Sequence, residues 1–168
     1  MYKIHNVLSN YERKKLIKEV QPFLMNNEQM NMHYNNSKFY PGKQTDPQLH
    51  LTAEFGTVMK KILDKIKKEI KLNLEIRRSW INWSNGREDQ MNWHHHYIFN
   101  DTSFAAVYYL KTIPFFSNGT LFEDGMVRVP QNSMIIFPSH ILHTTPTNLF
   151  HFIDRYVMGI DLNFRNLE

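Results

Sequence analysis

The hydropathy pattern of this chain changes near residue 71, and that change constrains the fold more than any other feature. From there on, short apolar or alternating segments are separated by turn dipeptides such as Asn85-Gly86, Asn118-Gly119 and Asp124-Gly125, a pattern typical of strands joined by tight turns. The segments expected to be strands are 74–83, 93–99, 104–111, 120–122, 127–129, 134–137 and 155–163.

Two amphipathic helices are expected before these strands. A capping-box pair, Ser9 and Glu12, opens the first helix. Asp46, an N-cap residue followed by proline, opens the second, whose apolar stripe runs to Ile70. Between them, residues 25–45 are polar, rich in asparagine and without periodicity, so we expect a long irregular segment. Residues 25–44 of it are expected to cover a binding site.

Helices followed by a run of short strands indicate a mainly β, α+β fold in which the helices pack on one face of a sandwich or jelly roll. The chain of 168 residues has the length of one domain. We therefore expect a single domain, 1–168, in which residues 1–73 provide helical support and a loop, and residues 74–168 form the β core.

The composition excludes several classes of protein. The chain has no cysteine, so disulfides and thiolate metal ligands are excluded, and imidazole and carboxylate remain as strong ligands. No apolar run approaches the roughly 20 residues that cross a bilayer, and the N-terminus has no export signal, so we expect a cytoplasmic protein without a membrane partner. The net charge of +4 is mild, and the lysines concentrate on expected helix faces, so we do not expect nucleic acid as a partner.

Three histidines are candidate metal ligands. Alternate residues of a strand share a face, so His94 and His96 can point inward together while His95 points away. His143 follows an apolar strand and a Pro-Ser turn, where a ligand at a strand edge can join them. Imidazole is a suitable ligand for iron(II). The alternative for the run His94-His95-His96 is an exposed strand end. The alternative for His143 is a structural role with a hydrogen bond.

Arg155 is a candidate anion-binding residue. It opens the last strand-like segment, in which apolar residues follow it, and burial of its charge requires an anion. A carboxylate ligand fits, because the guanidinium can bind both of its oxygens. The alternative is an ion pair at the surface with Asp154.

The order of these elements resembles the 2-oxoglutarate- and Fe(II)-dependent oxygenase superfamily, whose fold is a double-stranded β-helix. The resemblance is closest to a branch with the ordered motifs W-x-N, H-x-H, S-G-V-Y-Y, F-P-S-x-L-x-H, an arginine and S-F-N. The corresponding segments here are Trp80-Ile81-Asn82, His94-His95-His96, Ala105-Ala106-Val107-Tyr108-Tyr109, Phe137-Pro138-Ser139-His140-Ile141-Leu142-His143, Arg155 and Leu162-Asn163.

This resemblance implies that His94, His96 and His143 bind Fe(II). Most of the superfamily has H-x-D or H-x-E, whereas a neutral His96 leaves one more positive charge on the metal centre. The loop from His96 to the tyrosine pair and the loop from His143 to Arg155 are longer than the branch usually has. The choice among the three adjacent histidines therefore stays open, and Asp101 is an alternative carboxylate ligand.

The resemblance also implies a cosubstrate site. Tyr109 and Arg155 would hold the distal carboxylate of 2-oxoglutarate, whose keto-acid end chelates iron, and Asn82 would contact cosubstrate or substrate. A core position is the alternative for Tyr109, and a structural hydrogen bond for Asn82. The implied reaction uses O2 to decarboxylate 2-oxoglutarate to succinate and to hydroxylate a small molecule or a protein residue, prolyl residues included.

Two other functions are compatible with the residues. One is a cupin-like protein that holds a metal with three histidines and does not use 2-oxoglutarate. The other is a nucleobase-dealkylating oxygenase, which needs a basic groove and stacking aromatic residues. Trp83, Trp93 and Tyr97 offer such rings, but the sequence has no cluster of arginines beside them.

Overall fold

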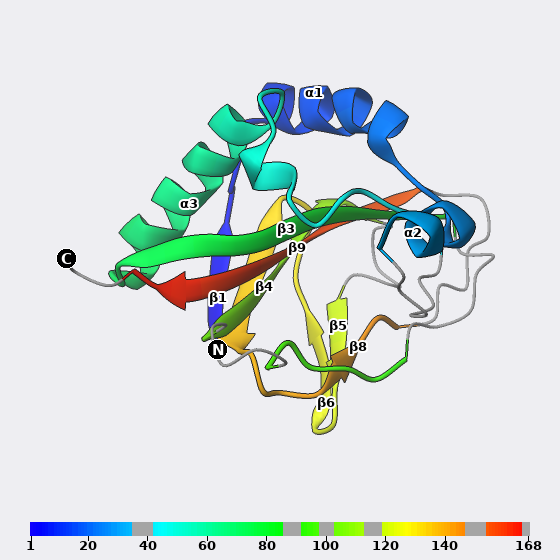
Figure 1. Cartoon of the computed structure of the whole chain (residues 1–168). Coiled ribbons are helices and arrows are strands. Elements are labelled where there is room, and N and C mark those ends of the chain that lie inside the picture. Colours follow the sequence, from blue (N-terminus) through cyan, green and yellow to red (C-terminus); the bar gives the residue numbers. More distant parts are fainter. Residues whose placement is uncertain (35–41, 86–91, 98–102, 113–118, 147–153, 166–168) are drawn as a thin grey trace.

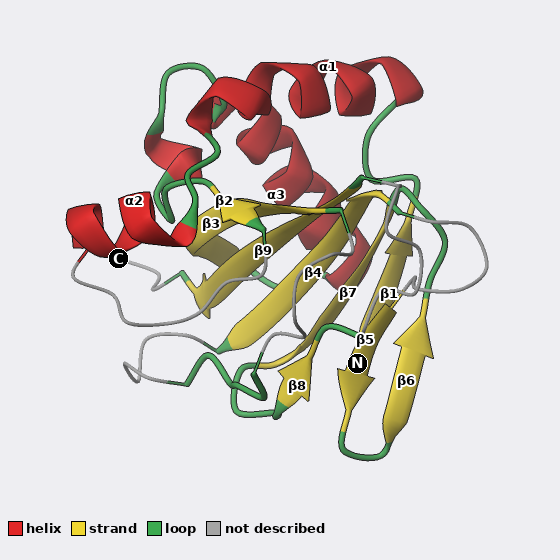
Figure 2. Ribbon diagram, turned by 90° about the vertical axis from the view of Figure 1, so that its right-hand side faces the viewer, coloured by secondary structure: helices red, strands yellow, loops and turns green. Residues whose placement is uncertain are grey.

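The computed structural model describes residues 1–34, 42–85, 92–97, 103–112, 119–146 and 154–165. These residues form two antiparallel sheets, and the two longest helices lie on the outer face of the larger sheet (Figures 1 and 2). This is the mainly β, two-layered jelly roll with helices on one face that the sequence predicted, a double-stranded β-helix.

The six-stranded sheet carries most of the chain. Its strands, in spatial order, are β1 (Tyr2–His5), β7 (Ser133–Pro138), β4 (Phe104–Lys111), β9 (Arg155–Phe164), β3 (Leu74–Ser84) and β2 (Lys43–Gln44). The three-stranded sheet has the order β6 (Gly125–Arg128), β5 (Gly119–Phe122) and β8 (His143–Thr144). The short strands β1, β2 and β8 were not predicted, and residues 1–73 therefore add two edge strands to the sheet as well as helices.

The two faces of β9 separate the two hydrophobic cores. Met158 and Ile160 pack with the helices in the first core, which lies between the large sheet and the helix layer. Val157 packs with Tyr109 and Phe122 in the second core, which lies between the two sheets. Alternate residues of a strand point to opposite faces, so the remaining odd-numbered residues of β9 face the space between the sheets.

The helix α1 (Asn10–Val20) begins as predicted, at a capping box. The Ser9 hydroxyl accepts the backbone N–H of Glu12, and the Glu12 carboxylate accepts the backbone N–H of Ser9. A short 3-10 helix, Gln21–Phe23, extends it. The capping pair thus fixes the end of α1 through local hydrogen bonds alone.

The helix α3 (Gly56–Ile70) begins later than predicted, so the expected N-cap at Asp46 is wrong. The Asp46 carboxylate instead accepts the N–H of Gln48 at 2.6 Å, within a turn before the short 3-10 helix Leu49–Leu51. This stretch is held against β3, because Ser79 donates its N–H to Pro47 at 2.8 Å. Hydrogen bonds to a strand distant in sequence override the local helix signal.

The expected irregular segment, residues 25–45, is wrong where it contains α2 (Asn27–Tyr34) and β2. Asn26 and Gln29 form a reciprocal cap, in which each side-chain oxygen accepts the other residue's backbone N–H at 2.9 Å. Residues 35–41 of the expected covering segment lie outside the described residues.

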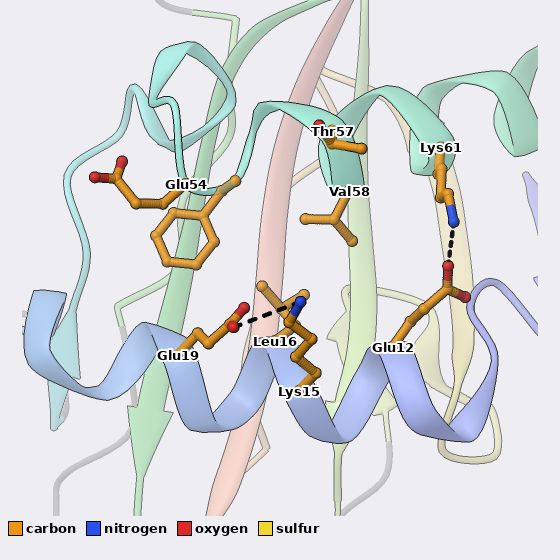
Figure 3. A pocket seen from close by; sticks show the side chains of 9 residues that line it. Glu12, Lys15, Leu16, Glu19, Glu54, Thr57, Val58 and Lys61 are labelled. Atoms are coloured by element: carbon orange, nitrogen blue, oxygen red, sulfur yellow. Dashed lines mark hydrogen bonds and ion pairs between the residues drawn. The ribbon is translucent and has the colours of Figure 1, made fainter.

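A groove separates α1 from α3 on the outer side of the molecule (Figure 3). Leu16, Phe55 and Val58 line its apolar floor, and an ion pair between Glu12 and Lys61 bridges the two helices at one end. None of the helices in the described ranges has the length and apolarity that crossing a membrane requires.

Candidate metal centre

Backbone hydrogen bonds bring the histidine run to β8. His94 and His143 form an antiparallel bridge in which each N–H donates to the other's carbonyl at 3.0 Å. The N–H of His96 donates to Ser139 at 2.8 Å instead of continuing a ladder. The expected strand at 93–99 is therefore wrong in its described part: only His94 bridges, because β8 is too short to pair with more of it.

The three candidate ligands converge. Ligand nitrogens of His94, His96 and His143 all lie within 4.8 Å of one another, and the ring centroids of His94 and His143 are 4.4 Å apart. His143 is buried, His94 and His96 are half-buried, and His95 is exposed. The structure thus separates His95 from the cluster as the strand argument predicted, while Asp101 lies outside the described residues.

Each ring has its Nδ1 beside an oxygen. His94 Nδ1 lies 2.9 Å from the carbonyl of Asn92, and His143 Nδ1 lies 3.0 Å from that of Ile141. A carbonyl oxygen only accepts, so Nδ1 carries the hydrogen in both rings, and a neutral ring then has its lone pair on Nε2. His96 follows the same rule, with a carboxylate of Asp161 as acceptor at 2.6 Å.

Burial keeps His143 in its neutral form. Loss of hydration, reinforced by the neighbouring His94, lowers the pKa of His143 to about 3. Neutral imidazole is the form that binds metals. Three converging imidazoles, each with Nδ1 already bonded, fit a divalent transition metal and leave coordination positions for further ligands.

Asp161 is a polar partner of the cluster that the sequence analysis missed. It is fully buried on β9 and pairs with Arg78 of β3 as well as with His96. One signal was available in the sequence: a carboxylate stands in the middle of an otherwise apolar strand, where it needs a partner. Which partner it has could not be inferred, because His96 and Asp161 are far apart in the chain.

Arg155 is buried at the start of β9, without a carboxylate partner among the described residues. Its Nη2 donates a long hydrogen bond of 3.5 Å to Gly119, and its Nε has no acceptor in the described part of the chain. Burial lowers the pKa of Arg155. The alternative partner Asp154 instead lies 3.7 Å from Lys111 and accepts the indole N–H of Trp83. A buried guanidinium in this state fits an anionic ligand.

Tyr109 lies in the core between the two sheets. Its hydroxyl shares a 2.6 Å hydrogen bond with Thr120 of β5, and burial raises the pKa of Tyr109 to about 12. The hydroxyl therefore stays protonated and can both donate and accept. Tyr109 also belongs to the core between the sheets, so the core position expected as its alternative holds as well.

Asn82 lies in the same row of paired residues across the large sheet as Tyr109. Both Asn82 on β3 and Tyr109 on β4 pair with Val157 on β9, so the three side chains share the face between the sheets. Asn82 is half-buried. The structure thus places Asn82, Tyr109 and Arg155 on one face of the large sheet and His143 on β8. His94 and His96 lie on the segment that bridges to β8 through His94, and the roles of all these residues in binding stay predictions.

Comparison with known proteins identifies the fold. No protein-family model matches the sequence, and no curated protein matches it significantly. Solved structures do match. The viral collagen prolyl hydroxylase of Paramecium bursaria Chlorella virus-1, in its 2-oxoglutarate complex, has a TM-score of 0.65 at 14% identity, with 98% of this chain and 96% of that chain covered.

Two further structures extend the comparison. EctD from S. alaskensis with bound iron has a TM-score of 0.66 at 13% identity and covers 97% of this chain and 72% of its own. HygX from Streptomyces hygroscopicus, with nickel, 2-oxoglutarate and hygromycin B bound, has a TM-score of 0.66 at 10% identity, covering 96% and 82%. The chain has the fold of these proteins. At such identities the similarity defines the fold and leaves the activity to be argued from the site.

Proposed function

We propose that this protein is an Fe(II)- and 2-oxoglutarate-dependent oxygenase. The observation that carries the proposal is the combination of three imidazoles with Nδ1 already bonded and a buried Arg155 without a carboxylate partner in the described residues. Proteins of the same fold have been solved with iron, nickel and 2-oxoglutarate. The motifs that resemble the H-x-H branch of this superfamily supply the same residues in the same order.

Each residue has a definite role in this proposal. His94, His96 and His143 would hold Fe(II). Arg155 would bind the distal carboxylate of 2-oxoglutarate through its free N–H donors, with the Tyr109 hydroxyl as a further donor. When bound, iron and 2-oxoglutarate supply the activation of O2, and the protein positions the reactants and excludes water.

Asn82 would contact the cosubstrate or the substrate, and its position on the inner face of the large sheet beside Tyr109 supports this role. The proposed outcome is hydroxylation of a C–H bond. Substrates of two classes are consistent with the fold, because one similar structure is a collagen prolyl hydroxylase and another contains hygromycin B. A peptidyl residue, prolyl included, and a small molecule are therefore both candidates.

Two further expectations stay predictions. One is that residues 1–168 form a single domain, and the other is that the protein is cytoplasmic.

The first experiment is an anaerobic titration of the metal-free protein with Fe(II), with and without 2-oxoglutarate. A chelated iron–keto-acid complex has a weak visible charge-transfer band, and we expect this band only when both components are present. His94→Ala and His143→Ala should abolish it, while His95→Ala, which removes the exposed histidine of the same run, should keep it. A wild-type protein without the band would contradict the proposal.

Arg155→Met distinguishes the oxygenase from a cupin-like metal protein. The substitution removes the guanidinium but keeps an apolar side chain of similar length, so we expect Fe(II) affinity to persist and 2-oxoglutarate affinity to fall at least tenfold, about 1.4 kcal/mol. Arg77→Met, at an exposed arginine that pairs with Glu75, is the matched control. Unchanged 2-oxoglutarate binding in Arg155→Met would favour the cupin-like function.

A nucleobase-dealkylating activity is the remaining alternative. It predicts affinity for nucleic acid that falls steeply with salt, because phosphate contacts release counterions. We expect no such affinity from a chain whose lysines lie mainly on the helices. A titration with single-stranded DNA at two salt concentrations tests this expectation.

A further inference from the structure

We infer that Asp161 is a positioning residue of the metal centre, whose carboxylate orients His96 and supplies negative charge that three neutral imidazoles lack. The inference rests on the metal site of the proposed function. In this inference, residues of the strands β9 and β3 help to hold His96, a candidate ligand that lies on a loop.

The geometry ties one carboxylate to two partners. Oδ1 of Asp161 accepts the Nδ1–H of His96 at 2.6 Å, and Oδ2 accepts the Nε–H of Arg78 at 2.6 Å. The Nη2 of Arg78 also lies 2.6 Å from Oδ2, in an ion pair. The Asp161 side chain is fully buried, whereas Arg78 is about one-third exposed. An unpaired carboxylate at such a position is strongly destabilising. The two partners therefore explain how the charge is retained inside the fold.

The contact differs in kind from those of the other two histidines. His94 and His143 donate to backbone carbonyls, which are neutral, whereas His96 donates to a carboxylate. A carboxylate on Nδ1 fixes the tautomer, directs Nε2 toward the metal and raises the basicity of the ring as a ligand. Asp161 thus offsets part of the metal's charge from one hydrogen bond away, without itself belonging to the converging nitrogens.

The ring of His96 is also held from its face. Trp80 of β3 stacks on it, with ring centroids 5.6 Å apart and planes at 13°. Trp80 itself lies over Gly159 of β9, where an added Cβ would lie 2.5 Å from the indole. Asp161 and Trp80 therefore restrain the in-plane rotation and the tilt of one ring. Both stand on long paired strands, which position side chains more accurately than loops do.

The test compares metal binding of Asp161→Asn with that of the wild type. We expect the anaerobic affinity for Co(II), and for Fe(II), to fall about 10–100-fold, the usual effect of removing an outer-shell partner. Glu75→Gln is the matched control, since it also removes a carboxylate from an arginine pair on β3 but lies away from the histidines. It should bind metal as the wild type does. A folded Asp161→Asn protein with wild-type affinity would overturn the inference.

A second measurement needs no metal, and its first part needs no variant. Long-range ¹H–¹⁵N NMR of the metal-free wild type reports the tautomer of each histidine, and we expect His96 to carry its proton on Nδ1. In Asp161→Asn, the His96 nitrogen shifts should change while those of His94 and His143 stay the same. A wild-type His96 protonated only on Nε2 would overturn the inference, even if the variant failed to fold.

The outcomes separate this inference from the proposed function. If metal binding weakens in Asp161→Asn but 2-oxoglutarate gives no charge-transfer band, the positioning role stands and the oxygenase function fails. If the band forms and Asp161→Asn binds metal normally, the function stands and the positioning role fails. A wild type that binds neither Co(II) nor Fe(II) would overturn both.

Discussion

Gly159 leaves room for an aromatic ring that the centre of the molecule uses. A Cβ at this position would lie 2.5 Å from two carbons of the Trp80 indole, and the ring cannot retreat, because its other side stacks on His96. The glycine is required here by the close approach of a side chain and not by its backbone conformation. One missing methyl group thus affects how the ring of a candidate ligand is supported.

We expect Gly159→Ala to lower the free energy of unfolding by about 1–3 kcal/mol, the usual range for overpacking in a core. Chemical denaturation monitored by tryptophan fluorescence measures this change. Gly56→Ala is the control, because the nearest atom to its added Cβ is a carbonyl oxygen at an ordinary 3.7 Å. If both substitutions have equal effects, the space beneath Trp80 is not a constraint.

The residues of the site differ in how far the sequence reveals them. The sequence singled out the three histidines and the arginine, because clustered imidazoles and a cation in an apolar strand are more typical of binding sites than of structural positions. These residues are His94, His96, His143 and Arg155. Asp161 could not be assigned a partner, since its hydrogen bond to His96 depends on how β9 passes beneath the histidine run.

At the scale of elements, an ion pair between Glu12 and Lys61 joins the helices α1 and α3. The Glu12 carboxylate accepts hydrogen bonds from Lys61 on α3 and from Ser9 at the start of α1. These contacts, with Lys61 the largest cause, lower the pKa of Glu12 to about 2. The deprotonated form is therefore favoured by folding, and α1 and α3 are joined by a pH-dependent contact.

The sign of this dependence follows from the direction of the shift. The pKa of Glu12 is lower in the folded than in the unfolded state, so its stabilisation is complete above about pH 4.5 and is lost as the pH falls toward 2. We expect the stability difference between the wild type and Glu12→Gln to shrink over that window. Urea denaturation at pH 5, 4 and 3 measures it, with Glu28→Gln on α2 as control. A constant difference would contradict the ion-pair contribution.

Elements were predictable where local signals suffice. The capping box placed the start of α1, and an apolar run placed β4 at its observed bounds. The start of α3 and the edge strand β1 were not predictable, because they depend on partners distant in the chain. Pro47 accepts a hydrogen bond from Ser79, and β1 pairs with β7, from Tyr2 opposite Ile136 to His5 opposite Ser133.

At the scale of the whole molecule, the order of helices and short strands was enough to predict a jelly roll with helices on one face. It could not specify which strands pair, because β9 lies between β3 and β4, which precede it by many residues. That pairing places Arg155 and Asp161 on the same inner face as Tyr109 and Asn82. The site is thus a product of topology more than of any one motif.

Metal binding should stabilise the whole fold, since the ligands come from segments distant in the chain. With free Co(II) at 100 times its dissociation constant, we expect about 2.7 kcal/mol of added stability, roughly 5–10 °C in Tm for a protein of this size. Differential scanning calorimetry with and without metal measures the shift. His143→Ala should show none, whatever its own Tm. An equal shift in this variant would indicate that the metal binds elsewhere.

The backbone bridge between His94 and His143 would also influence how the proposed centre takes up its metal. Reciprocal backbone hydrogen bonds of 3.0 Å hold these two candidate ligands together, and such bonds need no ion, so little ordering of their backbone would oppose coordination. The metal can then bind after the chain has folded and is not needed for folding, unlike in small domains that fold only around their ion. If the site binds iron as proposed, a chain synthesised during iron starvation would fold without the ion and could bind it later.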